Sequence, residues 1–150
     1  MQAMFGDLLR GLLASDPAPL ADPDARVAMA ALLVRVGRSG TGYTDIEVTR
    51  IDRILTVRYA LSPFAAVDLR RQAEALEAEA PDTVRFTRAI KDCVDLEHRQ
   101  SVIEAMWEVV LADGIRESEE DAQMRLLANL LGISDRDSNI ARLRVENRLA

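Results

Sequence analysis

The sequence contains few residues of the kinds that cross-link a protein or catalyse reactions, and no long apolar segment that would anchor it in a membrane. Its 150 residues include one cysteine, one histidine and one tryptophan, and aromatic residues make up only 4% of the chain. The lone Cys93 excludes a disulfide within the chain and favours a cytoplasmic location. A chain of this length buries enough surface in one core to fold without disulfides or a structural metal.

Long apolar runs are also missing. The longest spans residues 27–34, far short of the roughly 18 residues expected for a membrane helix. We therefore expect no transmembrane segment. The first 13 residues carry Asp7 and Arg10 within an apolar pattern, which does not resemble a secretory signal with its basic leader.

Lysine is nearly absent, since Lys91 is the only one, and basic residues are fewer than acidic ones. The 19 basic residues face 25 acidic ones, which gives a net charge of −6. Nucleic-acid binding depends on clustered basic charge, so we expect no nucleic-acid partner. The sequence also lacks a zinc-ligand pattern, a phosphate-binding loop, a dinucleotide fingerprint and a nucleophile with a base at recognisable spacing. We therefore expect no enzymatic activity.

Apolar residues recur at helical spacing along the whole chain, and no segment alternates as a strand does. The pattern predicts an all-α, single-domain bundle of about seven to eight helices. The clearest buried stripe consists of Ile103, Met106, Trp107, Val110 and Leu111. The expected helices lie within residues 4–12, 23–37, 44–59, 62–80, 82–90, 95–111, 118–132 and 134–150.

The chain divides into residues 1–23, a short helix with a Pro-rich linker, and a helical domain over residues 24–150. The first helix presents an apolar face with only Asp7 and Arg10 on its polar side. Such a face docks onto the core, pairs with a second copy or lies on a partner. We favour docking or a homodimer contact, because a membrane-surface helix carries more basic charge.

Two segments, about residues 24–60 and 96–134, follow the same plan of apolar helix, glycine turn and capped helix. Thr44 and Glu47 form a capping box, in which each satisfies an unpaired backbone donor near the helix start. Ser118 and Asp121 form an imperfect second box. The glycine turns and the capping boxes of the two segments are 74 residues apart, as in Thr44 and Ser118. The apolar positions match better at a separation of 73 residues, as in Ile51 and Met124. The sequence therefore predicts two related halves.

The second glycine turn is the most acidic part of the chain. One basic residue, Arg116, faces five acids, which are Asp113, Glu117, Glu119, Glu120 and Asp121. Carboxylates at a turn into a helix suit a divalent cation, namely calcium, magnesium, manganese or zinc. Alternatively, the same acids cap amides and complement the helix dipole. Glu104 and Glu108, one helical turn apart, are candidates for additional ligands or for a solvated face.

Several segments resemble the tellurite-resistance TerB-like family over residues 24–140. They are MWEVVLADG at 106–114, the pair Glu119–Glu120, LLGIS at 130–134, VRFT at 84–87 and AALLV at 30–34. The resemblance implies an all-helical domain of two related halves, without catalytic activity. It also implies metal-binding acids at the turns and a role in tellurite or stress response, often through protein partners at a membrane face.

Only Asp113, Glu119 and Glu120 carry over from the family pattern. In the first half, Ser39 stands where the second half has Asp113, with Arg38 beside it. Three functions are therefore compared: an interaction module tuned by a cation, a metal-dependent hydrolase using the acidic turn, and a purely structural scaffold. We favour the interaction module.

Overall fold

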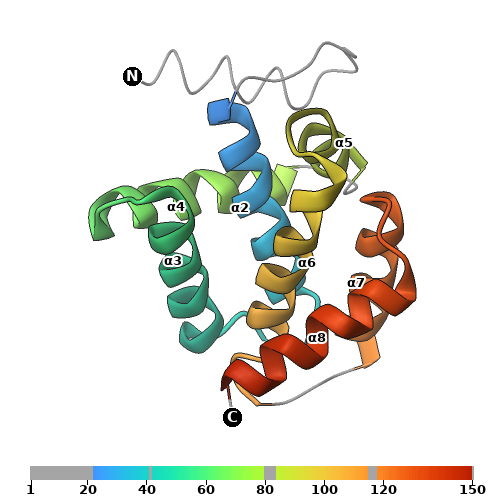
Figure 1. Ribbon diagram of the computed structural model, residues 1–150. Coiled ribbons are helices and arrows are strands. Elements are labelled where there is room, and N and C mark those ends of the chain that lie inside the picture. The colour runs from blue at the N-terminus through green and yellow to red at the C-terminus, as the bar shows by residue number, and fades with distance from the viewer. Residues whose placement is uncertain (1–21, 41, 80–83, 115–117, 150) are drawn as a thin grey trace.

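The computed structural model describes residues 22–40, 42–79, 84–114 and 118–149. Within these ranges the chain forms seven helices and no strand (Figure 1). The all-α prediction is confirmed. The helices are α2 (Asp22–Arg38), α3 (Asp45–Tyr59), α4 (Pro63–Glu79), α5 (Val84–Cys93), α6 (Leu96–Val110), α7 (Ser118–Leu130) and α8 (Asp135–Leu149).

Some predictions concern residues outside the described ranges. The expected helix at residues 4–12, most of the linker that follows it, and the cap at Asp82 are among them. The division of the chain at residue 23 stays a prediction, as does a homodimer through the first helix. Among the described helices, none combines the length and hydrophobicity that a bilayer crossing requires.

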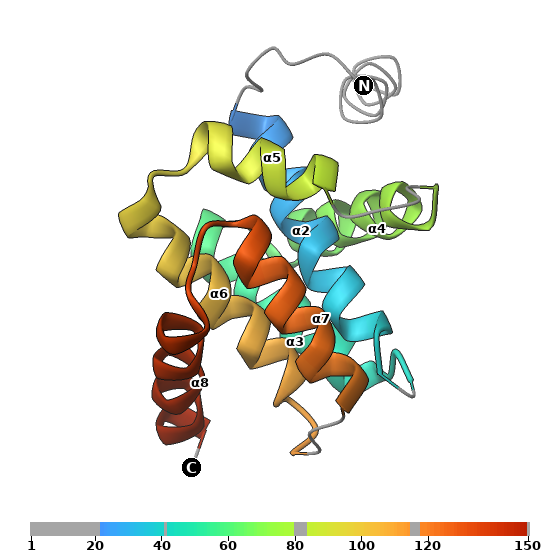
Figure 2. The same cartoon turned by 90° about the vertical axis from the view of Figure 1, so that its right-hand side faces the viewer.

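Helix α2 lies at the centre of the bundle and packs against α3, α4, α5, α6 and α7. Figure 1 shows α2 and α6 in the middle, with α3 and α4 on one side and α7 and α8 on the other; in Figure 2 α7 lies in front, toward the viewer. Ala28, Ala30 and Ala31 of α2 are fully buried, and such small side chains allow neighbouring helices to approach closely. Every residue of the apolar run 27–34 is buried, because a helix that is apolar on all sides must be surrounded by protein.

Helix α6 confirms the stripe predicted from the sequence. Ile103, Met106, Trp107 and Val110 are buried, and Leu111 packs against the core at the helix end. The indole Nε1 of Trp107 donates a hydrogen bond to Ser138 Oγ at 3.1 Å, which gives this buried polar atom a partner. The stripe thus joins α6 both to the core and to α8.

The ends of the helices follow local sequence signals. The predicted capping box at Thr44 is present, with the Thr44 amide donating to Glu47 Oε2 at 3.0 Å. Ser62 Oγ accepts a hydrogen bond from the Ala65 amide at 3.1 Å and caps α4. After α6 the backbone of Gly114 is left-handed, with φ of 76°, a conformation that favours glycine. This turn leads the chain toward α7.

Helices α3 and α7 each bury a glutamate near their N-terminal end. Glu47 is the third residue of α3 and 3% exposed, and Glu120 is the third residue of α7 and 4% exposed. Ile51 and Met124, which keep the same separation as the two glutamates, are both fully buried. Because α7 begins at Ser118 itself, Ser118 is inside the helix and not the cap before it. The register that aligns the apolar positions therefore also aligns the two buried glutamates.

Candidate functional site

The acidic turn lies where the chain leaves α6 and enters α7. Asp113 is half-buried and precedes the left-handed Gly114. Glu117 lies outside the described residues. Glu119, Glu120 and Asp121 occupy the first turn of α7, where the positive end of the helix dipole stabilises carboxylates. The turn therefore combines a sharp backbone bend with negative charge near a helix start.

The three acids at the start of α7 face different surroundings. Successive helix residues are rotated by about 100°, so that Glu119 is exposed, Glu120 is buried and Asp121 is half-buried. Over the described ranges, no three histidine, cysteine, aspartate or glutamate side chains come close enough to hold a metal ion. With Glu117 outside those ranges, the metal site of Asp113, Glu117, Glu119, Glu120 and Asp121 stays a prediction.

Asp121 lines a hollow together with a second carboxylate, Asp135, that the sequence did not associate with it. A small hollow of about 90 Å³ separates the start of α7 from the start of α8. Its lining consists of Trp107, Asp121, Arg125, Asp135, Ser138 and Asn139. Asp135 opens α8, so two helix starts bring a carboxylate each to this hollow. The charge of Arg125 partly balances the two acids.

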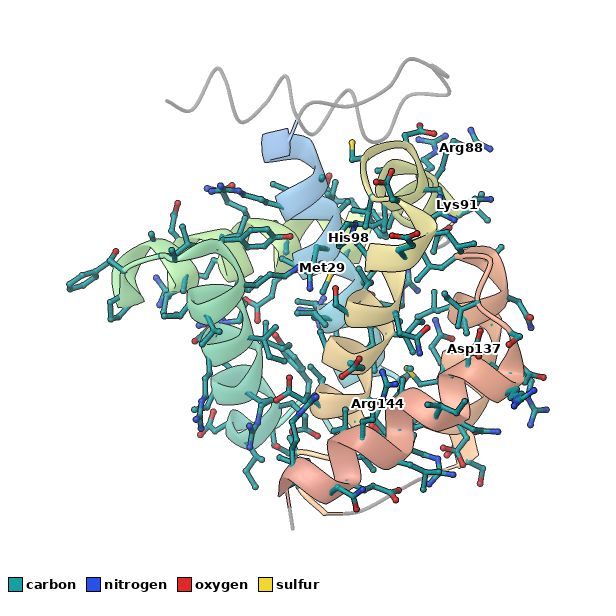
Figure 3. All side chains as sticks on the ribbon, in the orientation of Figure 1. Met29, Arg88, Lys91, His98, Asp137 and Arg144 are labelled. Carbon is teal, nitrogen blue, oxygen red and sulfur yellow. The ribbon has the colours of Figure 1, made fainter. Side chains whose placement is uncertain are left out.

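Glu104 and Glu108 do not extend the acidic turn. Glu104 pairs with two arginines of α8, at 2.8 Å from Arg148 and 3.8 Å from Arg144, and Glu108 lies 3.6 Å from Arg50 of α3. Figure 3 shows Arg144 on the part of α8 that crosses the lower end of α6. These two carboxylates are partly exposed and form ion pairs that join α6 to α8 and α3.

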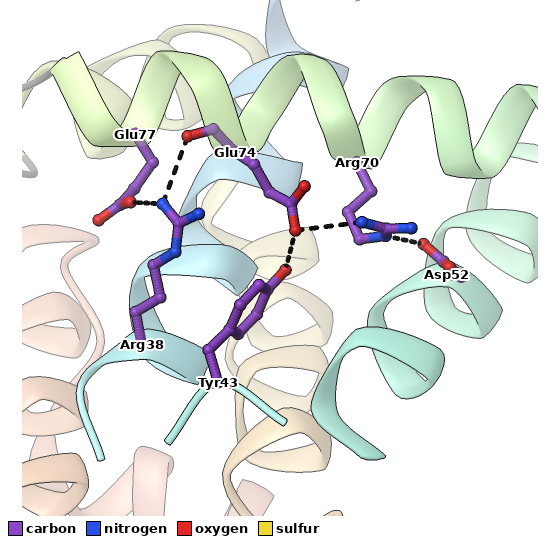
Figure 4. A network of polar contacts seen from close by, with 6 residues as sticks. All are labelled: Arg38, Tyr43, Asp52, Arg70, Glu74 and Glu77. Atoms are coloured by element: carbon purple, nitrogen blue, oxygen red, sulfur yellow. Dashed lines mark hydrogen bonds and ion pairs between the residues drawn. The ribbon is translucent and has the colours of Figure 1, made fainter. Parts of the chain in front are cut away.

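The first-half turn is held by a polar network that joins α2, α3 and α4 (Figure 4). Tyr43 Oη donates to Glu74 Oε2 at 2.7 Å, and the same oxygen accepts a hydrogen bond from Arg70 Nη1 at 3.1 Å. Arg70 also donates to Asp52 of α3 at 2.6 Å. Arg38, at the end of α2, donates to Glu77 and to the Glu74 carbonyl. The network fixes the turn between α2 and α3 against α4.

Both tyrosines of the chain are expected to resist ionisation in the folded protein. Burial raises the pKa of Tyr43, and its hydrogen bond to the negative Glu74 raises it further. Burial also raises the pKa of Tyr59, against the opposing charge of Arg58. Alkaline titration of the native protein should therefore show little phenolate absorbance at pH 10, where an unperturbed tyrosine is about half ionised.

Because both tyrosine pKa values are higher in the folded than in the unfolded state, the free energy of unfolding should decrease at high pH. An unfolded tyrosine loses its proton near pH 10, before the folded one does, so the native state is stabilised below that pH and loses this stability as the pH rises further. The same titration in denaturant supplies the reference. A native titration in which one tyrosine is half ionised near pH 10 would contradict the burial and hydrogen bonding described here.

The outer surface of α3 was not among the candidate sites expected from the sequence. A groove of about 640 Å³ runs between α3, α6 and the end of α8. Its α3 wall includes Arg53, which is exposed, and Val57, whose exposed fraction is 77%. The sequence feature that could have indicated this surface is the helical spacing of Ile46, Arg50, Arg53 and Val57. These residues share one helix face, yet they mix apolar and cationic side chains.

Comparisons with known proteins agree with the fold. The model of the family described as tellurite resistance protein TerB matches residues 26–143. No curated protein and no solved structure gave a significant match. The matched range begins near the start of α2 and ends within α8, so it includes most of the described bundle. The chain therefore belongs to the TerB family of tellurite resistance proteins.

Proposed function

We propose that this TerB-family protein is a non-enzymatic helical module that acts in the cytoplasm through contacts with other proteins. Its role lies in tellurite or stress response, with partners at a membrane face among the candidates. A divalent cation at the acidic turn tunes those contacts. The observation that carries the proposal is the family match over residues 26–143, which includes the whole acidic turn.

The chemistry of the turn supports a cation. Calcium, magnesium and manganese prefer oxygen ligands, and zinc also accepts carboxylates. The turn offers them on Asp113, Glu117, Glu119, Glu120 and Asp121. Asp135 adds a carboxylate beside Asp121 at the hollow between α7 and α8. A cation held at this end would therefore fix the start of α7 relative to α6 and α8.

The first half does not offer a second site of this kind. The Ser39 hydroxyl donates to the Val36 carbonyl at 2.6 Å, so it is engaged within the turn. Arg38 is ion-paired with Glu77, which keeps a positive charge next to that turn. We therefore propose one cation site in each chain, in the second half.

Thermal unfolding with and without divalent cations tests the site. A ligand that binds only the folded state stabilises it by about 2.7 kcal/mol at a hundredfold excess over its dissociation constant. We expect at least one of calcium, magnesium, manganese and zinc to raise the melting temperature above that in chelator. Asp113→Asn should abolish the increase. The matched control is Asp92→Asn, an exposed acid on α5, which should respond as the wild type does.

Two outcomes would redirect the proposal. If none of the four ions changes the melting temperature and Asp113→Asn melts as the wild type does, the cation part of the proposal is wrong and the scaffold interpretation is favoured. If the ion-loaded protein hydrolyses phosphoesters and Asp113→Asn removes that turnover, the protein is a metal-dependent hydrolase. A response to ions without turnover supports the non-enzymatic module.

A further inference from the structure

The groove between α3, α6 and α8 has an apolar floor that the described residues cover only in part. Ile54 and Val57 come from α3, Ala105 from α6 and Leu149 from the end of α8. Val57 is 77% and Leu149 38% exposed, whereas Ile54 and Ala105 are buried beneath them in the core. Apolar side chains that remain in contact with water beside a concave surface favour a partner that covers them. We call this surface the α3–α6 groove.

The rim of the α3–α6 groove is cationic in a protein that is acidic as a whole. Four arginines line it against two glutamates, namely Arg50, Arg53, Arg58 and Arg148 against Glu104 and Glu108. The two carboxylates are already engaged, Glu108 by Arg50 and Glu104 by Arg148. The groove therefore has an excess of positive charge, whereas the chain carries −6.

Two of these arginines have no carboxylate partner within the described residues. Arg58 donates to the Ser101 hydroxyl at 3.2 Å and lies beside the Tyr59 ring. Arg53 is exposed and makes no hydrogen bond or ion pair with another described residue. Guanidinium groups form strong, often bidentate, hydrogen bonds with carboxylates. Arg53 and Arg58 are thus available to acidic side chains of a partner.

The cationic surface continues along α3. Asp45, Ile46, Thr49, Arg50 and Arg53 line a second hollow of about 370 Å³, which shares Arg50 and Arg53 with the first. Ile46 is 54% exposed. The stretch from Ile46 to Val57 is about 16 Å long at the helical rise. This length matches a partner helix of about three turns.

We propose that the α3–α6 groove binds an acidic, amphipathic helical segment of a partner protein. Apolar side chains of the segment cover Val57 and Leu149, and its carboxylates pair with Arg53 and Arg58. A nucleic-acid backbone has no apolar face for the floor, and Glu104 and Glu108 repel its phosphates. The inference rests on the proposed function as a protein-binding module, and it names the surface and the chemistry of the partner.

A peptide library tests the proposal without fixing the charge of the ligand. Each peptide carries leucine at three positions of one helix face, and glutamate, lysine, serine or alanine at the others. After selection on the full-length protein, we expect enriched peptides to contain more glutamate than lysine. Their affinity, measured by fluorescence anisotropy with a labelled peptide, should fall with rising salt. Absence of enrichment, or enrichment of lysine, overturns the proposal.

Variants locate the binding surface. Arg53→Glu and Val57→Asp should each weaken binding of the labelled peptide by roughly tenfold or more. The matched controls are Arg136→Glu, an exposed arginine of α8, and Phe64→Asp, 90% exposed on α4; both should bind as the wild type does. All four positions are exposed, so we expect all four variants to melt near the wild-type temperature. Equal weakening by the controls overturns the assignment.

Two further measurements separate this inference from its alternatives. A second copy of the chain is another possible occupant, so dimerisation that depends on concentration and is lost in Arg53→Glu would contradict an acidic partner. Peptide binding is also measured in chelator and in calcium. Because none of the described residues of the acidic turn lines the groove, we expect equal affinities. Peptide binding without an ion-dependent melt would reject only the cation part of the proposed function, and the reverse would reject only the groove.

Discussion

Replacing Leu33 by alanine should lower the free energy of unfolding by about 2–5 kcal/mol. Leu33 is fully buried in α2, the helix that packs against α3, α4, α5, α6 and α7. Shortening the side chain removes apolar contacts and leaves a cavity, because surrounding helices held by other contacts relax only partly. The expected observation is a lower urea midpoint with an unchanged dependence on urea concentration.

The matched control for Leu33 is Leu143→Ala on α8. Leu143 is 51% exposed, so its loss should change the free energy of unfolding by less than about 0.5 kcal/mol. Equal effects of the two substitutions would contradict the central position of α2. A changed dependence on urea concentration would instead indicate that the substitution alters how much surface unfolding exposes.

Replacing Glu77 by glutamine should destabilise the protein by about 1–3 kcal/mol. Glu77 is 7% exposed, and its carboxylate pairs with Arg35 at 3.1 Å and with Arg38. Removing the charge leaves both guanidinium groups without their acidic partner. The two arginine side chains remain 23% and 33% exposed, so water compensates part of the loss and the effect stays below that of a fully buried pair.

A double-mutant cycle isolates this ion pair. Glu77→Gln and Arg38→Gln, alone and combined, should give a coupling energy of at least about 0.5 kcal/mol. Glu79→Gln, at the exposed end of α4, is the control for removing one negative charge from the same helix. Strictly additive losses in the cycle would show that Glu77 and Arg38 do not support each other, contrary to the network of Figure 4.

The helices were predictable because their signals are local. The α6 stripe, the capping box at Thr44 and the cap at Ser62 each depend on residues within one or two turns of one another. Ser118 was predicted to cap α7, whereas it lies inside that helix. Ser118 is a favourable capping residue, but the buried Glu120 corresponds to Glu47, and this correspondence aligns α7 with α3 by their apolar faces.

The interactions between helices were not predictable, because they depend on which faces meet. The sequence did not distinguish Glu77 from the other charged residues of α4. Its role depends on the packing of α2 against α4, which brings Arg35 and Arg38 next to it. Asp135 joins Asp121 only because the start of α8 lies near that of α7. The α3–α6 groove likewise requires three helices whose order of packing no local pattern specifies.

The most direct test of the account is an amide NMR titration of the full-length protein with calcium, magnesium, manganese or zinc, taking the ion that raises the melting temperature most. We predict that the amide signals that change lie at residues 113–121 and at the start of α8, with α3 and the first-half turn unchanged. Changes centred on the first-half turn, or no saturable change for any of the four ions, would contradict a cation-responsive second half.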